Sequence, residues 1–214
     1  MKRRSLSLAI LFLVSLFSCK DKVASTTEVY NNDFQTDNLT NIVGGATEEY
    51  NNTKVLGRYN NSGFTLSLSD LPKHDLITVS FLLYIHDSWD GNLPGISGPD
   101  IWEMFVDDKP YISTTFSNFP CSPTDICKPQ SYPDTYPNNL HNPQTGAALV
   151  DLPRGCKPTY PNGTSMYRIT KTFVHTGGSL SVKCFDKLIQ TTLTDLKCDE
   201  SWSVDNLNVK AITL

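Results

Sequence analysis

Apolar and polar residues alternate with a period of two in several short stretches of this chain. The longest such stretch carries five apolar residues at every second position over nine residues: Ile77, Val79, Phe81, Leu83 and Ile85. Because successive side chains of a strand point to opposite faces, this pattern predicts a strand with one fully buried face. The intervening positions are only partly polar, so we expect the second face to be partly covered as well.

The same period recurs along the chain and predicts an all-β fold. Residues 64–68 form a shorter alternating stretch, and residues 101–106 and 111–116 flank a polar turn, as in a β-hairpin. Strand character returns at residues 167–173 and 180–184, and residues 202–213 supply a final strand. No convincing amphipathic helix and no internal repeat occur. Short strands separated by Gly, Pro and Asn turns predict an antiparallel β-sandwich, specifically a jelly roll.

One long stretch breaks this pattern. Residues 119–165 hold nine of the thirteen prolines and three cysteines and have almost no periodicity. We therefore predict a Pro/Cys-rich loop insertion into the sandwich. A loop of this length inside a compact domain is either functional or a surface decoration, and the sequence leaves both interpretations open.

The first residues have the pattern of an export signal. Lys2, Arg3 and Arg4 precede an apolar run of 12 residues, which is too short for an ordinary transmembrane helix and is followed by Cys19. We expect residues 1–18 to be a lipoprotein signal peptide, with lipidation at Cys19; an ordinary secretory signal cut nearby is the alternative. Residues 19–30 then form a polar tether, and residues 31–214 form one domain.

The position that directly follows the expected lipidated cysteine holds Lys20 and not an aspartate. By resemblance to bacterial lipoproteins, this favours the outer membrane, and the signal resembles that of surface-exposed lipoproteins of the Bacteroidota type. The expected localisation is therefore the outer membrane or the cell surface, with membrane contact through the lipid anchor only.

The charge balance narrows the possible partners. The formal net charge is −4, and removal of the three basic signal residues leaves 15 Lys and Arg against 22 Asp and Glu, a net charge near −7. Such a surface argues against nucleic acid and against electrostatic binding to anionic lipid. It suits cations or neutral partners.

Five cysteines remain after Cys19, and an oxidising compartment favours two disulfides and one free thiol. We expect one bond to close residues 184–198, and another to lie within the insertion. The pairing itself cannot be deduced from sequence. The candidates are Cys121, Cys127, Cys156, Cys184 and Cys198.

Several motifs together resemble a known module. The runs DSWDGN, GPD and DESW recur in this order between predicted strands, within residues 55–118 and 167–209. They resemble a galactose-binding-like or lectin-like jelly-roll module of bacterial secreted and surface-anchored proteins. The resemblance implies this fold and no particular activity. The insertion has no counterpart in it, and Ser203 stands where glycine is expected.

Two acidic, Trp-centred segments carry the candidate chemistry. Calcium prefers six to eight oxygen ligands from adaptable loops, and residues 81–100 and 198–206 together offer such oxygens. The resemblance further implies a structural calcium that joins the first strand to the last through Asp33 and Asp205. The alternative is that these carboxylates cap turns. The expected calcium ligands are Asp33, Asp90, Asp100, Asp199 and Asp205.

A glycan is the expected ligand of the same segments. Sugar sites combine an aromatic plane with groups that bind hydroxyls, and both segments place a tryptophan beside such groups. The alternative is that both tryptophans belong to the core. The expected ligand-binding residues are Trp89, Asp87, Asp90, Asn92, Trp202 and Glu200.

Two other functions remain open from the sequence. The insertion 119–165 provides a surface for a protein partner, as in an adhesion module. Asp87 and Glu200 provide a carboxylate pair for glycoside hydrolysis, but no G-x-S-x-G nucleophile motif occurs, and we expect a non-enzyme. Every shared-site hypothesis makes one spatial prediction: Asp87 or Asp90 lies close to Asp199 or Glu200 at one end of the sandwich.

Overall fold

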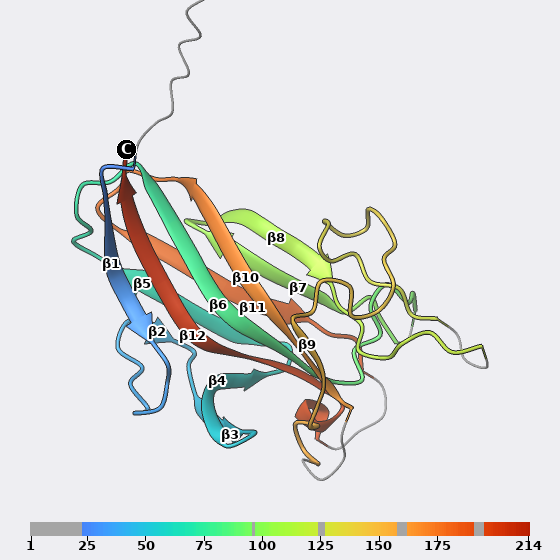
Figure 1. Cartoon of the computed structure of the whole chain (residues 1–214). Helices are drawn as coiled ribbons and strands as arrows, with labels where there is room; N and C mark the ends of the chain where they lie inside the picture. The colour runs from blue at the N-terminus through green and yellow to red at the C-terminus, as the bar shows by residue number, and fades with distance from the viewer. Residues whose placement is uncertain (1–22, 96, 124–126, 158–161, 191–194) are drawn as a thin grey trace, which may run out of the picture.

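Two antiparallel sheets pack face to face to form the molecule (Figure 1). The computed structural model describes residues 23–95, 97–123, 127–157, 162–190 and 195–214. The first sheet contains β1 (Ser25–Asn32), β3 (Thr47–Tyr50), β4 (Thr53–Tyr59), β6 (Leu76–Asp87), β9 (Leu149–Leu152), β10 (Thr164–Val174) and β12 (Glu200–Thr213). The second contains β2 (Ile42–Val43), β5 (Gly63–Leu68), β7 (Ile101–Val106), β8 (Lys109–Thr115) and β11 (Leu180–Lys187). A short 3-10 helix, η1 (Leu196–Cys198), precedes β12.

The strand order shows how the chain builds the sandwich. The seven-stranded sheet runs β3-β4-β12-β6-β10-β9, with β1 also paired to β12, and the five-stranded sheet runs β2-β5-β11-β7-β8. The connections from β5 to β6 and from β10 to β11 therefore cross between the sheets. The predicted jelly-roll β-sandwich is confirmed.

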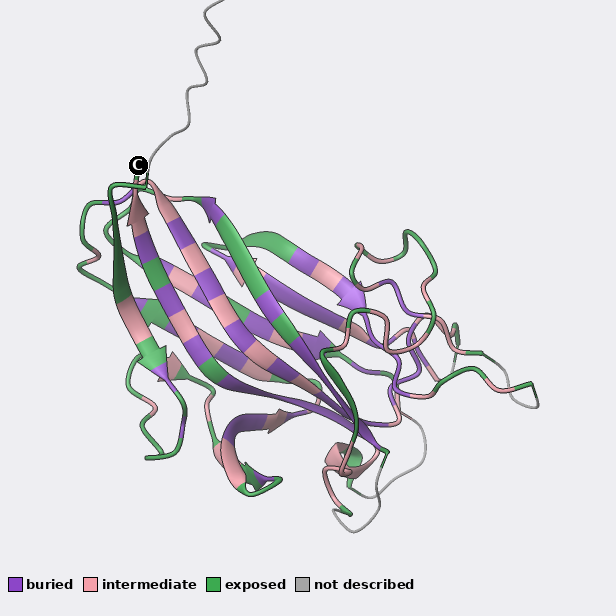
Figure 2. Ribbon diagram, viewed as in Figure 1, coloured by how far each residue is buried: buried purple, intermediate pink, exposed green. Residues whose placement is uncertain are grey.

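The core lies between the sheets, as the alternating buried and exposed bands of Figure 2 show. Every second residue of β6 from Ile77 to Ile85 is buried, as the alternation predicted. The centre of the core is aromatic: the Trp102 and Trp202 rings lie 5.7 Å apart at 88°, in the edge-to-face arrangement that aromatic quadrupoles favour.

The N-terminal part of the domain differs from the sequence prediction. A tether was expected up to residue 30, but β1 begins at Ser25 and pairs with β12, so the tether is wrong for residues 25–30. The prediction also missed β2, β3 and β4. Cys19 and residues 1–22 lie outside the described residues. Among the residues that the structure does describe, no helix is long and apolar enough to cross a membrane.

The insertion is mostly loop, as predicted, but it is tied to the sheets. Its β9 pairs with β10 at the edge of the seven-stranded sheet, and β10 already begins at Thr164. The Tyr132 and Tyr136 N–H groups donate to carbonyls of β8, at 3.2 and 2.9 Å. These bonds cover part of an edge that would otherwise expose unpaired backbone groups.

The cysteines that the structure describes form two disulfides and leave one free thiol, as the cysteine count predicted. The bonds join Cys121 to Cys127 and Cys156 to Cys198. The expected bond between Cys184 and Cys198 is wrong, because Cys184 is a free, buried residue of β11 inside the core. Cys198 instead links the start of β12 to the insertion.

The Cys156–Cys198 bond should stabilise the domain more than the Cys121–Cys127 bond. The two bonds span 42 and 6 residues. In the chain-entropy model such loops are worth about 4 and about 2 kcal/mol. We expect Cys156→Ala/Cys198→Ala to lower the free energy of unfolding in guanidinium about twice as much as Cys121→Ala/Cys127→Ala. Equal losses would contradict this ranking.

Candidate functional site

The two acidic segments meet at the end of the sandwich where β6 stops and β12 begins. Asp87 and Glu200 are register partners across these strands. The Ser88 N–H and hydroxyl both donate to the Asp199 carbonyl, each at 2.8 Å. The predicted proximity of Asp87 to Asp199 and Glu200 is therefore confirmed.

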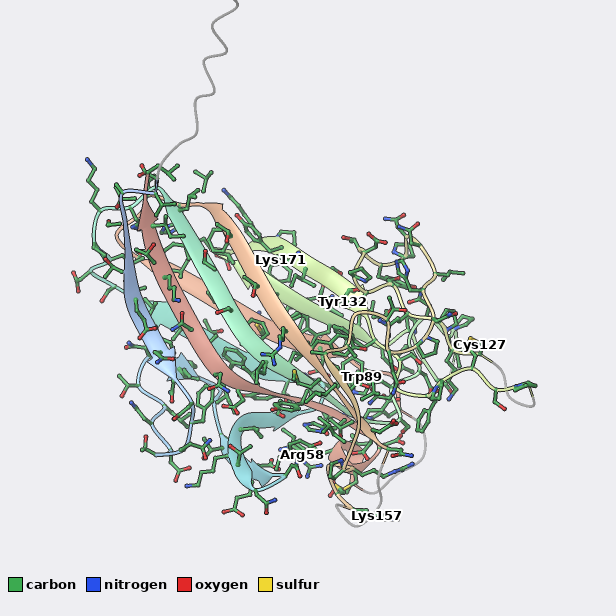
Figure 3. All side chains as sticks on the ribbon, in the orientation of Figure 1. Arg58, Trp89, Cys127, Tyr132, Lys157 and Lys171 are labelled. Atoms are coloured by element: carbon green, nitrogen blue, oxygen red, sulfur yellow. A yellow bond between two sulfur atoms is a disulfide. The ribbon has the colours of Figure 1, made fainter. Side chains whose placement is uncertain are left out.

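Both candidate sugar-stacking tryptophans are core residues. Trp89 and Trp202 are completely buried. The Trp89 Nε1–H donates to the Ser201 carbonyl at 2.9 Å, and that of Trp202 donates to the Asp186 carboxylate at 2.7 Å. The prediction that they contact ligand is wrong, because no face of either indole is open. Trp89 lies among the side chains at this end of the core (Figure 3).

Three of the expected ligand carboxylates form a sealed cluster beneath this end. Asp90, Asp100 and Glu200 are at most 8% exposed. The Asp90 N–H donates to Asp100 at 2.5 Å, and Lys128 forms an ion pair with Asp90. Burial and the neighbouring carboxylates raise the pKa of both Asp100 and Glu200. This arrangement fits two hydrogen-bonded carboxyls that share a proton rather than an open binding surface.

Asn92 holds the insertion in place. Its side-chain carbonyl accepts from the Thr115 hydroxyl, and its amide donates to Ser131 at 3.0 Å. Both of its polar groups are thus used between β8 and the start of the insertion. Its expected role in ligand binding has no support in this geometry.

The five expected calcium ligands do not converge on one point. Asp90, Asp100 and Asp199 lie at the loop end, whereas Asp33 and Asp205 lie where β1 and β12 meet. Asp205 is buried, and burial followed by the Asp33 charge raises its pKa to about 6. No ion pair among the described residues neutralises either of these two carboxylates. Two neighbouring carboxylates without an ion-pair partner supply at most four of the six to eight oxygens that calcium prefers.

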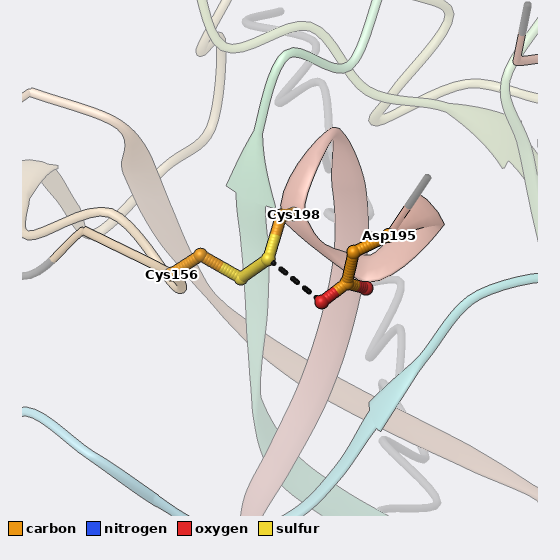
Figure 4. A group of neighbouring side chains, drawn as sticks. All are labelled: Cys156, Asp195 and Cys198. Atoms are coloured by element: carbon orange, nitrogen blue, oxygen red, sulfur yellow. Dashed lines mark hydrogen bonds between the residues drawn. A yellow bond between two sulfur atoms is a disulfide. The ribbon is translucent and has the colours of Figure 1, made fainter. Parts of the chain in front are cut away.

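A further group of candidate metal ligands cannot form a metal site because two of its members are joined in a disulfide. Within the described part of the chain, only Cys156, Asp195 and Cys198 bring three candidate ligand atoms within 4.8 Å of one another (Figure 4). The two sulfurs are joined in the disulfide, and the Cys198 sulfur lies 3.2 Å from the Asp195 carboxylate. A disulfide sulfur has no thiolate charge with which to bind a metal.

The accessible part of the acidic end is a cavity of about 350 Å³ beside the disulfide. Asp87 is 2% exposed at its floor, and its carboxylate accepts from the Gly155 N–H at 3.2 Å. Burial raises the pKa of Asp87 to about 6, and the charges of Arg154 and Arg58 oppose this shift. The lining residues are Asp87, Ser88, Arg154, Cys156, Lys157, Cys198 and Asp199.

A second cavity of about 360 Å³ adjoins the first, because Arg154 lines both. It lies against the β3–β4 hairpin, whose turn residues Asn51 and Asn52 have positive φ angles of 48° and 65°. Such angles favour Asn and Gly. The lining residues are Glu49, Tyr50, Asn51, Asn52, Pro153, Arg154 and Gly155.

Tyr50 fixes the two sides of this second cavity. Its hydroxyl donates to the Pro153 carbonyl at 2.8 Å, and its ring lies 4.5 Å from the His86 ring. His86 is buried, and its Nε2 lies 2.7 Å from the Ser203 hydroxyl. Burial and the Arg58 charge lower the pKa of His86 to about 3, so the ring is neutral. A rigid, uncharged support therefore lies behind Tyr50.

Arg58 and Arg154 differ in how they are used. Arg58 donates to Glu48 at 3.1 Å and to the Lys197 carbonyl at 3.2 Å, which ties β4 to η1 (Figure 3). Arg154 has no hydrogen bond or ion pair with any described residue, although it is only partly exposed. Its guanidinium is therefore the available donor at the junction of the two cavities, which we call the Arg154 groove.

The sequence prediction missed the Arg154 groove. The signal for its hairpin was present in the Asn51-Asn52 pair, which is typical of a tight turn between strands. Arg154 had no such signal, because it lies in the irregular insertion and reaches the groove only through folding.

The carboxylate pair proposed for hydrolysis is divided between two environments. Asp87 faces the groove beside Arg58 and Arg154, whereas Glu200 faces Asp100 and Asp90 in the sealed cluster. Glu200 is 3% exposed, so it does not share an open site with Asp87. This geometry does not favour a glycosidase centre.

No family model and no curated protein match the sequence. Solved structures with similar chain paths include a family 35 carbohydrate binding module from Clostridium thermocellum, with a TM-score of 0.36, 12% identity, and coverage of 87% of this chain and 98% of that one. A carbohydrate binding module from Cellvibrio mixtus lichenase 5A, in complex with cellotriose, has a TM-score of 0.36, 10% identity, and coverage of 86% and 97%. Dimeric latent PorU from Porphyromonas gingivalis has a TM-score of 0.36 and 9% identity over 70% of this chain, which spans only 10% of PorU. Since similarity at this level does not identify a ligand, function has to be inferred from the residues of this chain.

Asp87→Asn should change how stability depends on pH. Because the folded pKa of Asp87 is about 6, above its ordinary 3.8, its contribution is fully present at low pH and lost as pH rises through 6. From pH 4 to pH 7.5, the wild type should therefore lose roughly 1–2 kcal/mol more of its free energy of unfolding than Asp87→Asn loses, after allowance for residual solvation. Urea denaturation at both pH values measures this difference. Asp108→Asn, in the exposed β7–β8 turn, is the control, and an equal change in both variants would contradict the assignment.

Proposed function

We propose that the protein is a non-catalytic, lipid-anchored module of a cell surface that binds a neutral glycan in the Arg154 groove. The observation that carries the glycan proposal is the junction of two cavities of about 360 and 350 Å³ at the partly buried Arg154, which has no hydrogen bond or ion pair with a described residue. The lipid anchor rests on the sequence pattern of residues 1–19 alone.

The size and lining of the groove support a hydroxyl-rich ligand. Each cavity lies at the lower end of the range for small-molecule sites, which is about 300–1,000 Å³. Most such sites are mainly apolar, whereas polar groups form the larger part of the lining beside the β3–β4 hairpin and about half of the lining beside the disulfide. Sugar hydroxyls both donate and accept, so they can satisfy this mixed set.

The charges support a neutral rather than an acidic sugar. Asp87, Asp199 and Glu49 line the groove against the positive charges of Arg154 and Lys157. An anionic ligand would gain at Arg154 but meet carboxylates on either side. A neutral ligand accepts from Arg154 and donates to the carboxylates without a net charge penalty.

Arg154→Ala and Asn52→Gly should weaken glycan binding. Loss of a hydrogen bond from a charged group costs about 1.5–3 kcal/mol, or roughly tenfold or more in Kd. Glycine keeps the positive φ of Asn52 and removes only its amide side chain. A glycan array followed by calorimetry, on a chain of residues 23–214, measures the effect.

Lys171→Ala is the matched control, since Lys171 is exposed on β10 away from the groove (Figure 3). Unchanged affinity of Arg154→Ala for a glycan that the wild type binds would place the site elsewhere. Absence of binding to any glycan would overturn the glycan proposal itself.

A protein partner is the second candidate. Among its described residues, the insertion exposes three large apolar side chains: Leu140 is 71% exposed, Leu149 is 51% exposed and Val150 is 42% exposed. Exposed apolar residues are common at protein contacts. A negative glycan array together with loss of partner binding in Leu140→Ser would favour this function.

We also propose a structural calcium at Asp33 and Asp205. The buried Asp205 is destabilising when ionised, since its pKa is raised to about 6, and a cation between the two carboxylates would remove this cost. Extracellular calcium modules bind in the range of about 0.1–1 mM. The proposed role is to hold the end of β1 against β12.

Calcium should therefore raise the melting temperature at pH 7.5 and much less at pH 5, where Asp205 is protonated. We expect millimolar calcium to raise the melting temperature, relative to chelator, by about 2–4 °C for each kcal/mol that calcium binding adds to the free energy of unfolding. Calorimetry measures this increase. Asp205→Asn should abolish the increase and Asp108→Asn should retain it. Identical melting curves with and without calcium at pH 7.5 would refute the proposal.

A further inference from the structure

Two histidines are in contact at the end of the sandwich opposite the Arg154 groove. His74 lies in the connection from β5 to β6, and His175 lies in the connection from β10 to β11. Their ring planes are nearly parallel, at 8° with centroids 5.0 Å apart, and the rings meet edge to edge, with His74 Nε2 2.7 Å from His175 Nδ1. His74 is 3% exposed, and the His175 side chain is 9% exposed.

The outer nitrogens of the pair also have partners. His74 Nδ1 lies 2.6 Å from the Pro72 carbonyl, and His175 Nε2 lies 3.2 Å from the Asp107 carboxylate. A continuous chain of contacts thus runs from the Pro72 carbonyl through both imidazoles to Asp107 in the β7–β8 turn.

The number of protons in this chain follows from its two ends. The Pro72 carbonyl only accepts, so His74 Nδ1 carries a hydrogen, and the contact of His175 Nε2 with Asp107 becomes an ion pair only when that nitrogen carries one as well. The nitrogens that face each other at 2.7 Å need one further hydrogen between them. Three hydrogens on four ring nitrogens give the pair a charge of +1. Two neutral imidazoles have only two hydrogens and leave one contact unmade.

We infer that His74 and His175 share one extra proton and form a pH-dependent clasp between the two sheets. Each histidine lies in a connection that crosses from one sheet to the other, and Asp107 belongs to the five-stranded sheet. Loss of the shared proton leaves a lone pair facing a lone pair or facing Asp107. Gain of a second proton sets two N–H groups against each other. The clasp is complete only in the singly protonated state.

The charges around the pair are consistent with one positive charge. Asp107 faces His175 directly, and its other oxygen accepts from the Ser181 N–H at 2.9 Å. The Asp75 carboxylate accepts from the Leu214 N–H at 2.8 Å, and the Asp75 carbonyl accepts from the His175 N–H at 3.1 Å. Lys73 precedes His74, and its carbonyl accepts from the Thr213 hydroxyl.

The backbone bonds of this end depend on the clasp. The Leu71 N–H donates to the Gly178 carbonyl at 3.0 Å, which joins the same two connections, and the His175 N–H bond to Asp75 lies beside it. When the clasp is incomplete, these amides should open more often, while amides at the groove end should not.

Nitrogen NMR of the protein labelled in its histidines tests the shared proton. We expect hydrogens on His74 Nδ1 and His175 Nε2, and coupled titrations in which His74→Gln shifts the titration of His175 and His175→Gln shifts that of His74. His141→Gln is the control, because His141 contacts Asp134 on the insertion. Two imidazoles that titrate independently, each unaffected by replacement of the other, would overturn the inference.

Hydrogen exchange tests the clasp without requiring any variant to fold. Protection of the Leu71 and His175 amides, corrected for intrinsic rates, should be greatest at the pH at which NMR finds one extra proton on the pair. It should fall roughly tenfold at lower and at higher pH. The Ser88 amide, bonded to Asp199 at the groove end, should not show this maximum. A flat profile at Leu71 and His175 would refute the clasp.

Discussion

The structure depends most on the pairing of β6 with β12. These strands are central in the seven-stranded sheet, and their register sets Asp87 opposite Glu200 at one end and Leu76 opposite Ile212 at the other. A shift by one residue would turn the buried side chains of β6 towards solvent, so the core fixes this register. The same register brings together two acidic segments that are more than 100 residues apart in sequence.

An irregularity in this pairing divides β12 into two parts with different partner strands. The register shifts between Asp205 and Asn208, and Asn206 has a φ of 53°. Before this bulge the outer edge of β12 pairs with β4, and after it the same edge pairs with β1. Bulges re-aim side chains at such changes of partner. Asp205 lies at the bulge, and Asp33 directly follows β1. These positions bring the two carboxylates together where β12 changes partner, away from the carboxylates at the loop end.

The sequence predicted the parts of the structure that depend on regular burial. The alternating residues of β6 could be read because each apolar side chain enters one core, whereas β1 and β3 were missed because their exposed polar faces leave little alternation. The tryptophans were ambiguous because polar neighbours suit both a ligand site and a capped core indole. Burial decides for Trp89 and Trp202, and it depends on contacts that local sequence does not contain. The Cys156–Cys198 bond was unpredictable for the same reason, since the insertion has no period to place it.

The insertion has a structural part and a groove-forming part. Its middle covers the edge of β8, while its last portion brings Arg154 and Cys156 against the strand ends. The disulfide to Cys198 and the Tyr50 hydroxyl bond to Pro153 hold this portion from two sides. Each restraint alone would leave a loop free to pivot, but together they fix the backbone on both sides of Arg154. The backbone that carries Arg154 is therefore held at the junction of the cavities, so that less backbone ordering entropy would be lost if a ligand bound there.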